Sequence, residues 1–177
     1  NQMHVHSNNS ENWKVTLVDT GGTTMTGGRI KRIKEYINDT FLLTYGDGVS
    51  NVNITKLVDL HRKSKTLATM TVVKPQGRFG SVSLDGDTVN KFIEKPLGES
   101  GWINGGFFVL DRKCMDYIDN DLTIWEREPL EKLAQSNKLS AYKHTGFWQP
   151  MDTLRDMNYL NDLYHSNEIA PWHKFDE

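Results

Sequence analysis

The sequence predicts an α/β fold in which a mixed, mainly parallel sheet is flanked by helices, with an added β-hairpin. Apolar runs of strand length alternate along the chain with helical stripes, a pattern typical of parallel strands joined by helices. A turn signal between two strand-like runs adds the hairpin. The 177 residues, 37% hydrophobic and 25% charged, suit one globular domain. We therefore expect a single domain over residues 1–177, with the polar residues 1–12 irregular.

Strands and helices alternate through the first half of the chain. Lys14–Asp19 is a short strand-like run, and a loop rich in Gly and Thr follows it. Arg29–Ile37 carries isoleucines at spacings of three and four, which predicts a helix. Phe41–Tyr45 is a compact apolar run typical of a buried strand. An amphipathic helix over Ile54–His61 and a β-rich strand over Leu67–Val73 complete this half.

The pattern changes after Pro75. Ser81–Leu84 and Val89–Lys95 flank Asp85-Gly86-Asp87, which predicts a hairpin. Phe107–Leu110 is a short apolar strand, and the helix expected after it runs through Cys114–Ile118.

Two helices and one strand are expected in the last third. Thr123-Ile124-Trp125-Glu126 has the spacing of a capping box, so a helix should begin there and continue through Leu130–Ala134. Leu139–His144 is strand-like. Leu154, Met157, Leu160 and Tyr164 form the apolar face of a C-terminal helix.

Composition and spacing exclude several classes of protein. The net charge of −2 shows no basic excess that would favour nucleic-acid binding. No apolar run approaches the roughly 20 residues of a membrane-spanning helix. The single Cys114 fits a reducing compartment, so we expect a cytoplasmic protein. The histidines lack zinc-site spacing, and there is no P-loop.

Tyr45-Gly46-Asp47-Gly48 directly follows the strand expected at Phe41–Tyr45. Ligands of open α/β sheets bind beyond the carboxyl ends of the strands. The glycines on both sides of Asp47 would let a ligand approach the backbone, and a carboxylate there suits a hard cation such as Mg²⁺. Gly-Asp-Gly is also common in turns, so spacing alone leaves a simple turn as the alternative.

Two further segments could contact a phosphorylated sugar. Glu94 and Lys95 are neighbours on a strand and face opposite sides, so one could accept a sugar hydroxyl while the other meets a phosphate. A surface charge pair is the alternative. Asn104 can donate and accept hydrogen bonds, and Gly105 and Gly106 after it allow close approach; a loop before a core strand is the alternative.

Two helix starts are also candidates. Asp152 is placed to be the N-cap of the C-terminal helix, and its second oxygen could face a metal. Thr26-Gly27-Gly28-Arg29 lies at the start of the first helix, where backbone amides suit anions and Arg29 adds a fork of donors. A simple loop is the alternative.

Taken together, these segments resemble the sugar-1-phosphate nucleotidylyltransferases. They follow the order of that family from residue 13 almost to the end of the chain, and the resemblance implies a Rossmann-like nucleotidyltransferase fold. The segments that carry it are Lys14–Gly21, Thr24–Arg29, Thr44–Gly48, Gly77–Gly80, Glu94–Pro96, Ile103–Leu110 and Gly146–Asp156.

The resemblance is to the cytidylyl-transferring branch, so it implies that CTP and α-D-glucose 1-phosphate give CDP-glucose and pyrophosphate. In bacteria of this family the product feeds the synthesis of surface polysaccharide. It implies Mg²⁺ bound by Asp47 and Asp152, Lys95 at the sugar phosphate, and Glu94 and Asn104 at the sugar hydroxyls. The sugar phosphate oxygen is already ionised, so the enzyme must bring two anions together and stabilise charge at phosphorus.

The resemblance also assigns residues to the nucleotide. Thr26, Gly27 and Arg29 would lie on the nucleotide side, and Tyr45 and Gly46 would border both ligands. Two alternatives stay open: a related enzyme that uses UTP or dTTP, and a non-catalytic domain that binds or regulates.

The opening strand of the family, its Gly-Gly-x-Gly-Thr-Arg loop and a following lysine do not occur in the 177 residues. The resemblance therefore covers roughly the last two thirds of such an enzyme, a partial nucleotidyltransferase domain. The loop that cradles the CTP phosphates would lie in the missing part, so we expect the chain to be inactive alone. We also expect a homo-oligomer.

Overall fold

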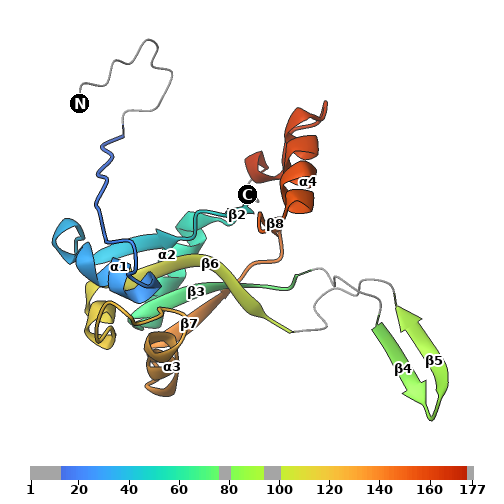
Figure 1. Cartoon of the computed structure of the whole chain (residues 1–177), viewed down its shortest axis with the longest axis horizontal. Coiled ribbons are helices and arrows are strands. Elements are labelled where there is room, and N and C mark those ends of the chain that lie inside the picture. The colour runs from blue at the N-terminus through green and yellow to red at the C-terminus, as the bar shows by residue number, and fades with distance from the viewer. Residues whose placement is uncertain (1–12, 76–80, 94–100, 175–177) are drawn as a thin grey trace.

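A computed structural model describes residues 13–75, 81–93 and 101–174. Its centre is a four-stranded sheet with the strand order β1-β6-β3-β7. The strands are β1 (Thr40–Thr44), β3 (Ala68–Val73), β6 (Ile103–Asp111) and β7 (Leu139–Lys143). Figure 1 shows helices on the sheet and the hairpin at the opposite end of the view from α1.

The prediction of a mixed sheet flanked by helices is confirmed, and strand direction refines it. β3 pairs in parallel with β7, whereas β6 is antiparallel to both β1 and β3. β1, β3 and β7 therefore run the same way, with β6 reversed between β1 and β3. The carboxyl ends of those three strands lie at one edge of the sheet, where the amino end of β6 also lies.

One face of the sheet is covered by α1 (Thr26–Arg32), the 3₁₀ helix η2 (Arg112–Tyr117) and α3 (Glu128–Gln135). Their buried side chains, including Ile30, Met115 and Leu133, form one core cluster with Phe108 of β6, Ala68 of β3 and Trp125 of the turn before α3. The opposite face is covered by α2 (Ile54–Ser64), which contacts β3, β6 and β7. Within the described residues, no helix is long and apolar enough to cross a bilayer.

Two smaller sheets complete the fold. The predicted hairpin is confirmed as β4 (Ser81–Asp85) and β5 (Thr88–Ile93). A ladder that local patterns did not predict joins β2 (Gly48–Ser50) to β8 (Trp148–Pro150). The C-terminal helix is confirmed as α4 (Leu154–His165), and two short 3₁₀ helices, η1 (Lys34–Tyr36) and η3 (Pro171–His173), complete the element list.

The strand predicted at Lys14–Asp19 is wrong. These residues have no regular secondary structure, and the side chains of Val15 and Leu17 are 71% and 92% exposed. A strand needs a neighbour that exchanges backbone hydrogen bonds with it, and none of the described strands pairs with this segment.

Several boundaries also differ from the sequence prediction. The first helix begins at Thr26 rather than Arg29 and ends at Arg32, before the separate turn η1. The strand predicted at Phe107–Leu110 begins earlier, at Ile103. The residues around Asn104, for which a loop was the alternative, belong to β6, because Ile103 and Asn104 pair with Val73 and Val72 of β3. The helix expected over Cys114–Ile118 is the 3₁₀ helix η2.

The two predicted helix caps are wrong. α3 begins at Glu128 after Arg127, whose side chain makes no cap, so Thr123 and Glu126 form no capping box. α4 is capped by Thr153 rather than Asp152, and Thr153 forms a reciprocal capping box with Asp156.

Candidate active site

An open cavity of about 430 Å³ lies beyond the carboxyl end of β1. Its lining residues are Thr26, Tyr45, Gly46, Asp47 and Glu126. Four of these five residues are among those predicted from the sequence, and they come from two segments, the start of α1 and the turn after β1. This edge of the sheet is where open α/β folds bind ligands.

The ring of Tyr45, which lines the cavity, is held in place by buried aromatic side chains of the core. Phe108 of β6 is 1% exposed and contacts both Tyr45 and Trp125 edge-on, at centroid distances of 5.9 and 6.2 Å. Gly106 has φ of +80°, and a Cβ there would lie 2.7 Å from Cδ2 of Tyr45. A glycine is therefore required at position 106 to seat the Tyr45 ring.

Asn104 is connected to the cavity by a hydrogen bond to Tyr45, which lines it. Its Nδ2 donates to the Tyr45 hydroxyl over 3.0 Å, and its Oδ1 accepts from the amide of Gly106 over 2.9 Å. Burial raises the pKa of Tyr45 well above its usual range, and the Glu126 carboxylate raises it further, while Asn104 opposes the shift. Tyr45 therefore stays a neutral phenol that can donate a proton in a hydrogen bond.

Backbone pairing brings the segments of the two predicted metal ligands together. The amide of Met151 donates to the carbonyl oxygen of Asp47 over 2.8 Å, which continues the β2–β8 ladder. Asp152 follows Met151 directly, so the two aspartates lie on adjoining segments. Within the described residues, no group of three or more His, Cys, Asp or Glu side chains gathers. Mg²⁺ commonly binds through one or two carboxylates together with substrate phosphates and water, so carboxylates on these two segments are of the chemical type that suits it.

The start of α1 does not offer its amides to an anion. The amides of Gly27 and Gly28 both donate to the carbonyl oxygen of Thr123, over 3.0 and 3.3 Å, and Met25 donates to Asp121. A Cβ on Gly28 would lie 2.6 Å from the backbone of Asp121. The expectation of amides open to an anion at this helix start is therefore wrong: the glycines let the loop at residues 120–123 pack against α1.

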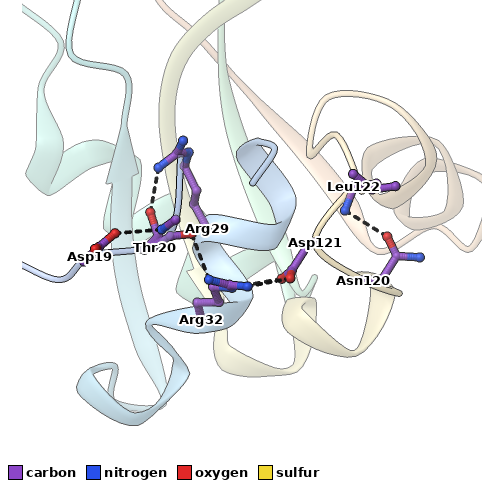
Figure 2. A network of polar contacts seen from close by, with 8 residues as sticks. Asp19, Thr20, Arg29, Arg32, Asn120, Asp121 and Leu122 are labelled. Atoms are coloured by element: carbon purple, nitrogen blue, oxygen red, sulfur yellow. Dashed lines mark hydrogen bonds and ion pairs between the residues drawn. The ribbon is translucent and has the colours of Figure 1, made fainter. Parts of the chain in front are cut away.

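Arg29 lies outside the set of cavity-lining residues. Its Nη1 donates to Oγ1 of Thr20 over 2.7 Å (Figure 2). Arg32, one turn further, binds the Asp121 carboxylate with two nitrogens and also donates to the carbonyl of Thr20. Figure 2 shows that these arginines connect the segment at Asp19 and Thr20 to α1, and that Arg32 reaches on to Asp121. The Arg32 guanidinium lowers the pKa of Asp121.

Two predicted sugar-phosphate residues, Glu94 and Lys95, lie outside the described residues. The motif Gly77–Gly80 and residues 1–12, which were expected to be irregular, also lie outside them.

Sequence reasoning missed Glu126 as a cavity residue. Its position three residues after Thr123 suggested a helix cap, but the helix begins later and the Glu126 side chain lines the cavity. Oγ1 of Thr26 donates to its Oε2 over 2.7 Å. The segment Ile124–Glu126 is not in a regular helix, and this placement depends on a contact 100 residues away that no local pattern encodes.

Comparison with known proteins supports the resemblance seen in the sequence. A family model described as nucleotidyl transferase matches residues 8–165. A glucose-1-phosphate cytidylyltransferase of Salmonella typhi is 52% identical over 174 residues, which cover 97% of this chain and 67% of that protein. A mannose-1-phosphate guanyltransferase of Yarrowia lipolytica is 29% identical over 158 residues, covering 82% of this chain and 44% of that protein.

Among solved structures, HddC from Yersinia pseudotuberculosis superposes with a TM-score of 0.56 at 24% sequence identity. The match covers 78% of this chain and 61% of the HddC chain. At this level of identity the likeness concerns the fold, and the fold agrees with the predicted α/β class.

Proposed function

The chain belongs to the nucleotidyl transferase family, and from this premise we propose that it transfers a cytidylyl group from CTP to α-D-glucose 1-phosphate. The products are CDP-glucose and pyrophosphate. The choice of substrates rests on the 52% identity with the Salmonella typhi cytidylyltransferase, since the guanyltransferase is 29% identical. The protein would act in the cytoplasm as a homo-oligomer.

The observation that carries the proposal is the cavity at the end of β1. Thr26 from the expected nucleotide side and Tyr45, Gly46 and Asp47 from the expected meeting point of both ligands line the same space. The attacking oxygen of the sugar phosphate is ionised near neutral pH, so the site needs no general base. Its work is to align two anions and to stabilise the charge that develops at the α-phosphorus.

Asp47 and Asp152 would hold Mg²⁺, which when bound offsets the phosphate charge. Asn104 would bind a sugar hydroxyl, supported by its anchoring to Tyr45 and Gly106. Lys95 would neutralise the sugar phosphate and Glu94 would bind a second hydroxyl. Gly27 and Arg29 would contribute to the nucleotide side through groups other than the Gly27 amide, which is already bonded.

We further propose that residues 1–177 alone have little activity. A triphosphate needs a row of donors, and neither the family's Gly-Gly-x-Gly-Thr-Arg loop nor its lysine is in this sequence. The 177-residue chain would therefore bind glucose 1-phosphate weakly and form CDP-glucose at a negligible rate.

The test is pyrophosphate release from nucleoside triphosphate and glucose 1-phosphate, with Mg²⁺, by the protein at its full natural length. CTP should be the preferred nucleotide over UTP and dTTP. Preference for UTP or dTTP would assign the protein to a related enzyme, and binding without turnover would assign it to a non-catalytic domain. Turnover by residues 1–177 alone at the rate of the longer protein would contradict the proposed need for the loop.

A further inference from the structure

The carboxylate of Glu126 has a place in the cavity that the proposed function does not yet use. Glu126 is half-buried and lines the same space as Asp47 and Tyr45. Its Oε2 accepts from Thr26 Oγ1 over 2.7 Å, and Thr26 Oγ1 in turn accepts from the amide of Trp125 over 2.9 Å. Because the Thr26 oxygen is occupied by that amide, its proton points to Glu126.

The loop that carries Glu126 is held by other groups. The carbonyl oxygen of Thr123 accepts from two amides of α1, and that of Asp121 accepts from the amide of Met25 just before α1. Arg32 binds the Asp121 carboxylate with two nitrogens. Trp125 is 0% exposed and packs against Phe108. These contacts secure the loop through backbone atoms and neighbouring side chains, so a charged carboxylate at position 126 is not needed to hold it.

An ionised carboxylate is an acceptor only, with about four lone-pair positions on its two oxygens. Thr26 uses one of them. Tyr45 lines the same cavity, and its hydroxyl oxygen accepts from Asn104 Nδ2. The Glu126 carboxylate raises the pKa of Tyr45, as a nearby negative charge does. Glu126 is thus oriented by Thr26 and has acceptor capacity toward the cavity.

We infer that Glu126 is a further substrate-binding residue, which accepts a hydrogen bond from an N–H or O–H group of a substrate. This inference rests on the proposed function. Two substrate groups have this chemistry: the exocyclic amino group of cytosine, which carboxylates recognise and which uracil lacks, and a hydroxyl of the sugar phosphate. The charge of Glu126 would also disfavour a phosphate at the same position.

The test compares Glu126→Gln with Glu128→Gln in the protein at its full natural length. The glutamine introduced by Glu126→Gln can still accept from Thr26, but it replaces a charged acceptor oxygen with an NH₂ donor. Glu128→Gln makes the same change of charge on an exposed residue in the first turn of α3, outside the cavity. The readouts are the KM values for CTP, UTP and glucose 1-phosphate, the kcat, and the thermal midpoint.

A hydrogen bond to a charged group is worth about 1.5–3 kcal/mol, so Glu126→Gln should raise one KM roughly 10-fold or more. If the donor is the cytosine amino group, the KM for CTP rises and the preference for CTP over UTP narrows. If the donor is a sugar hydroxyl, the KM for glucose 1-phosphate rises and the nucleotide preference stays. Thr26→Val, which removes the donor that orients Glu126, should change the same KM in the same direction, whereas Thr26→Ser should not.

If Glu126→Gln leaves the KM values for CTP and for glucose 1-phosphate unchanged, the inference is overturned, whether or not the thermal midpoint falls. Equilibrium titrations with CTP and with glucose 1-phosphate separate it from the proposed function. If the protein binds a substrate without turnover, the proposed function fails, and a weaker affinity of Glu126→Gln alone still supports the inference. If Glu126→Gln binds both ligands as tightly as the parent protein, the inference fails while the proposed function is unaffected.

Discussion

The amide of Met151 donates a hydrogen bond to the carbonyl oxygen of Asp47 over 2.8 Å. This bond uses only backbone atoms, so it survives a change of the Asp47 side chain. It places the segment that carries Asp152 beside the turn after β1, at the edge of the sheet where the cavity opens. The Asp47 carboxylate can therefore be altered without detaching the two segments.

Asp47→Asn should abolish most Mg²⁺-dependent turnover while leaving the fold intact. Asn keeps the shape of the side chain but loses the charge that a hard cation requires, and the loss of metal-assisted charge stabilisation should lower kcat by roughly 100-fold or more. Because Asp47 is exposed, the free energy of unfolding should change by less than about 0.5 kcal/mol. Turnover and its Mg²⁺ dependence are measured beside Asp87→Asn, an exposed aspartate in the hairpin turn. Full turnover in Asp47→Asn would remove Asp47 from the metal site.

Gly28→Ala should destabilise the protein although alanine favours helices. The added Cβ would lie 2.6 Å from backbone atoms of Asp121, so the loop must shift. Overpacking of this kind costs about 1–3 kcal/mol, more than the roughly 1 kcal/mol that alanine gains over glycine in a helix. Denaturant unfolding measures the difference. Gly22→Ala is the control, because a Cβ there meets nothing within 4 Å; equal stability of the two variants would contradict the packing role of Gly28.

Gly106→Ala should disturb the cavity as well as the fold. It combines a φ of +80° with a Cβ 2.7 Å from the Tyr45 ring, so we expect a loss of about 1–3 kcal/mol in unfolding free energy. Gly86→Ala separates the two causes, since Gly86 has φ of +58° but nothing within 4 Å. Gly106→Ala should therefore be the less stable variant and should also bind substrates more weakly. Equal losses in the two variants would mean that the Tyr45 ring moves aside at no cost.

Stability should fall as the solution becomes mildly acidic, partly through His61. His61 is 7% exposed and its Nδ1 lies 2.9 Å from Oγ1 of Thr69. Burial lowers the pKa of His61 in the folded state, with nearby Asp111 opposing the shift. The unfolded chain then binds a proton first, near its ordinary pKa of about 6.5. The contribution of His61 is complete above that pH and is lost as the pH falls toward the folded-state pKa.

Denaturant unfolding over a pH series measures this effect. His61→Gln should flatten the slope of unfolding free energy against pH below about 6.5. His165→Gln, at an exposed position on α4, should keep the slope of the parent protein. A slope that is the same in all three proteins would show that His61 does not contribute to the pH dependence.

The parts of the fold that were predictable have a local signal. The apolar period over α2 and α4, the compact run at β3 and the turn between β4 and β5 each indicate their structure within a dozen residues. The strand expected at Lys14–Asp19 failed because a strand is defined by its neighbour, not by its composition. The β2–β8 ladder was missed for the same reason, since its two strands are three residues long and stand far apart in the chain.

In the candidate site, too, the residues with a local sequence signal could be predicted and those that depend on distant contacts could not. Asp47 and Tyr45 could be located because they follow a strand whose end faces ligands in α/β folds. Glu126 could not, because its role depends on Thr26. The misassigned caps show a further limit: Thr123 and Asp152 are suitable capping residues, yet Arg127 and Thr153 hold those positions.

The capping of α1 by a distant loop has a consequence for how the protein folds. α1 has seven residues, and isolated helices shorter than about 12–15 residues are marginal in water. Its stabilising partners at Trp125 and Glu126 lie 99 and 100 residues away from Thr26. During synthesis, therefore, α1 should not form stably until residues 121–126 have left the ribosome. One wall of the cavity therefore forms only after most of the chain has been synthesised. On refolding, the recovery of substrate binding should not precede the formation of the contact between α1 and residues 121–126.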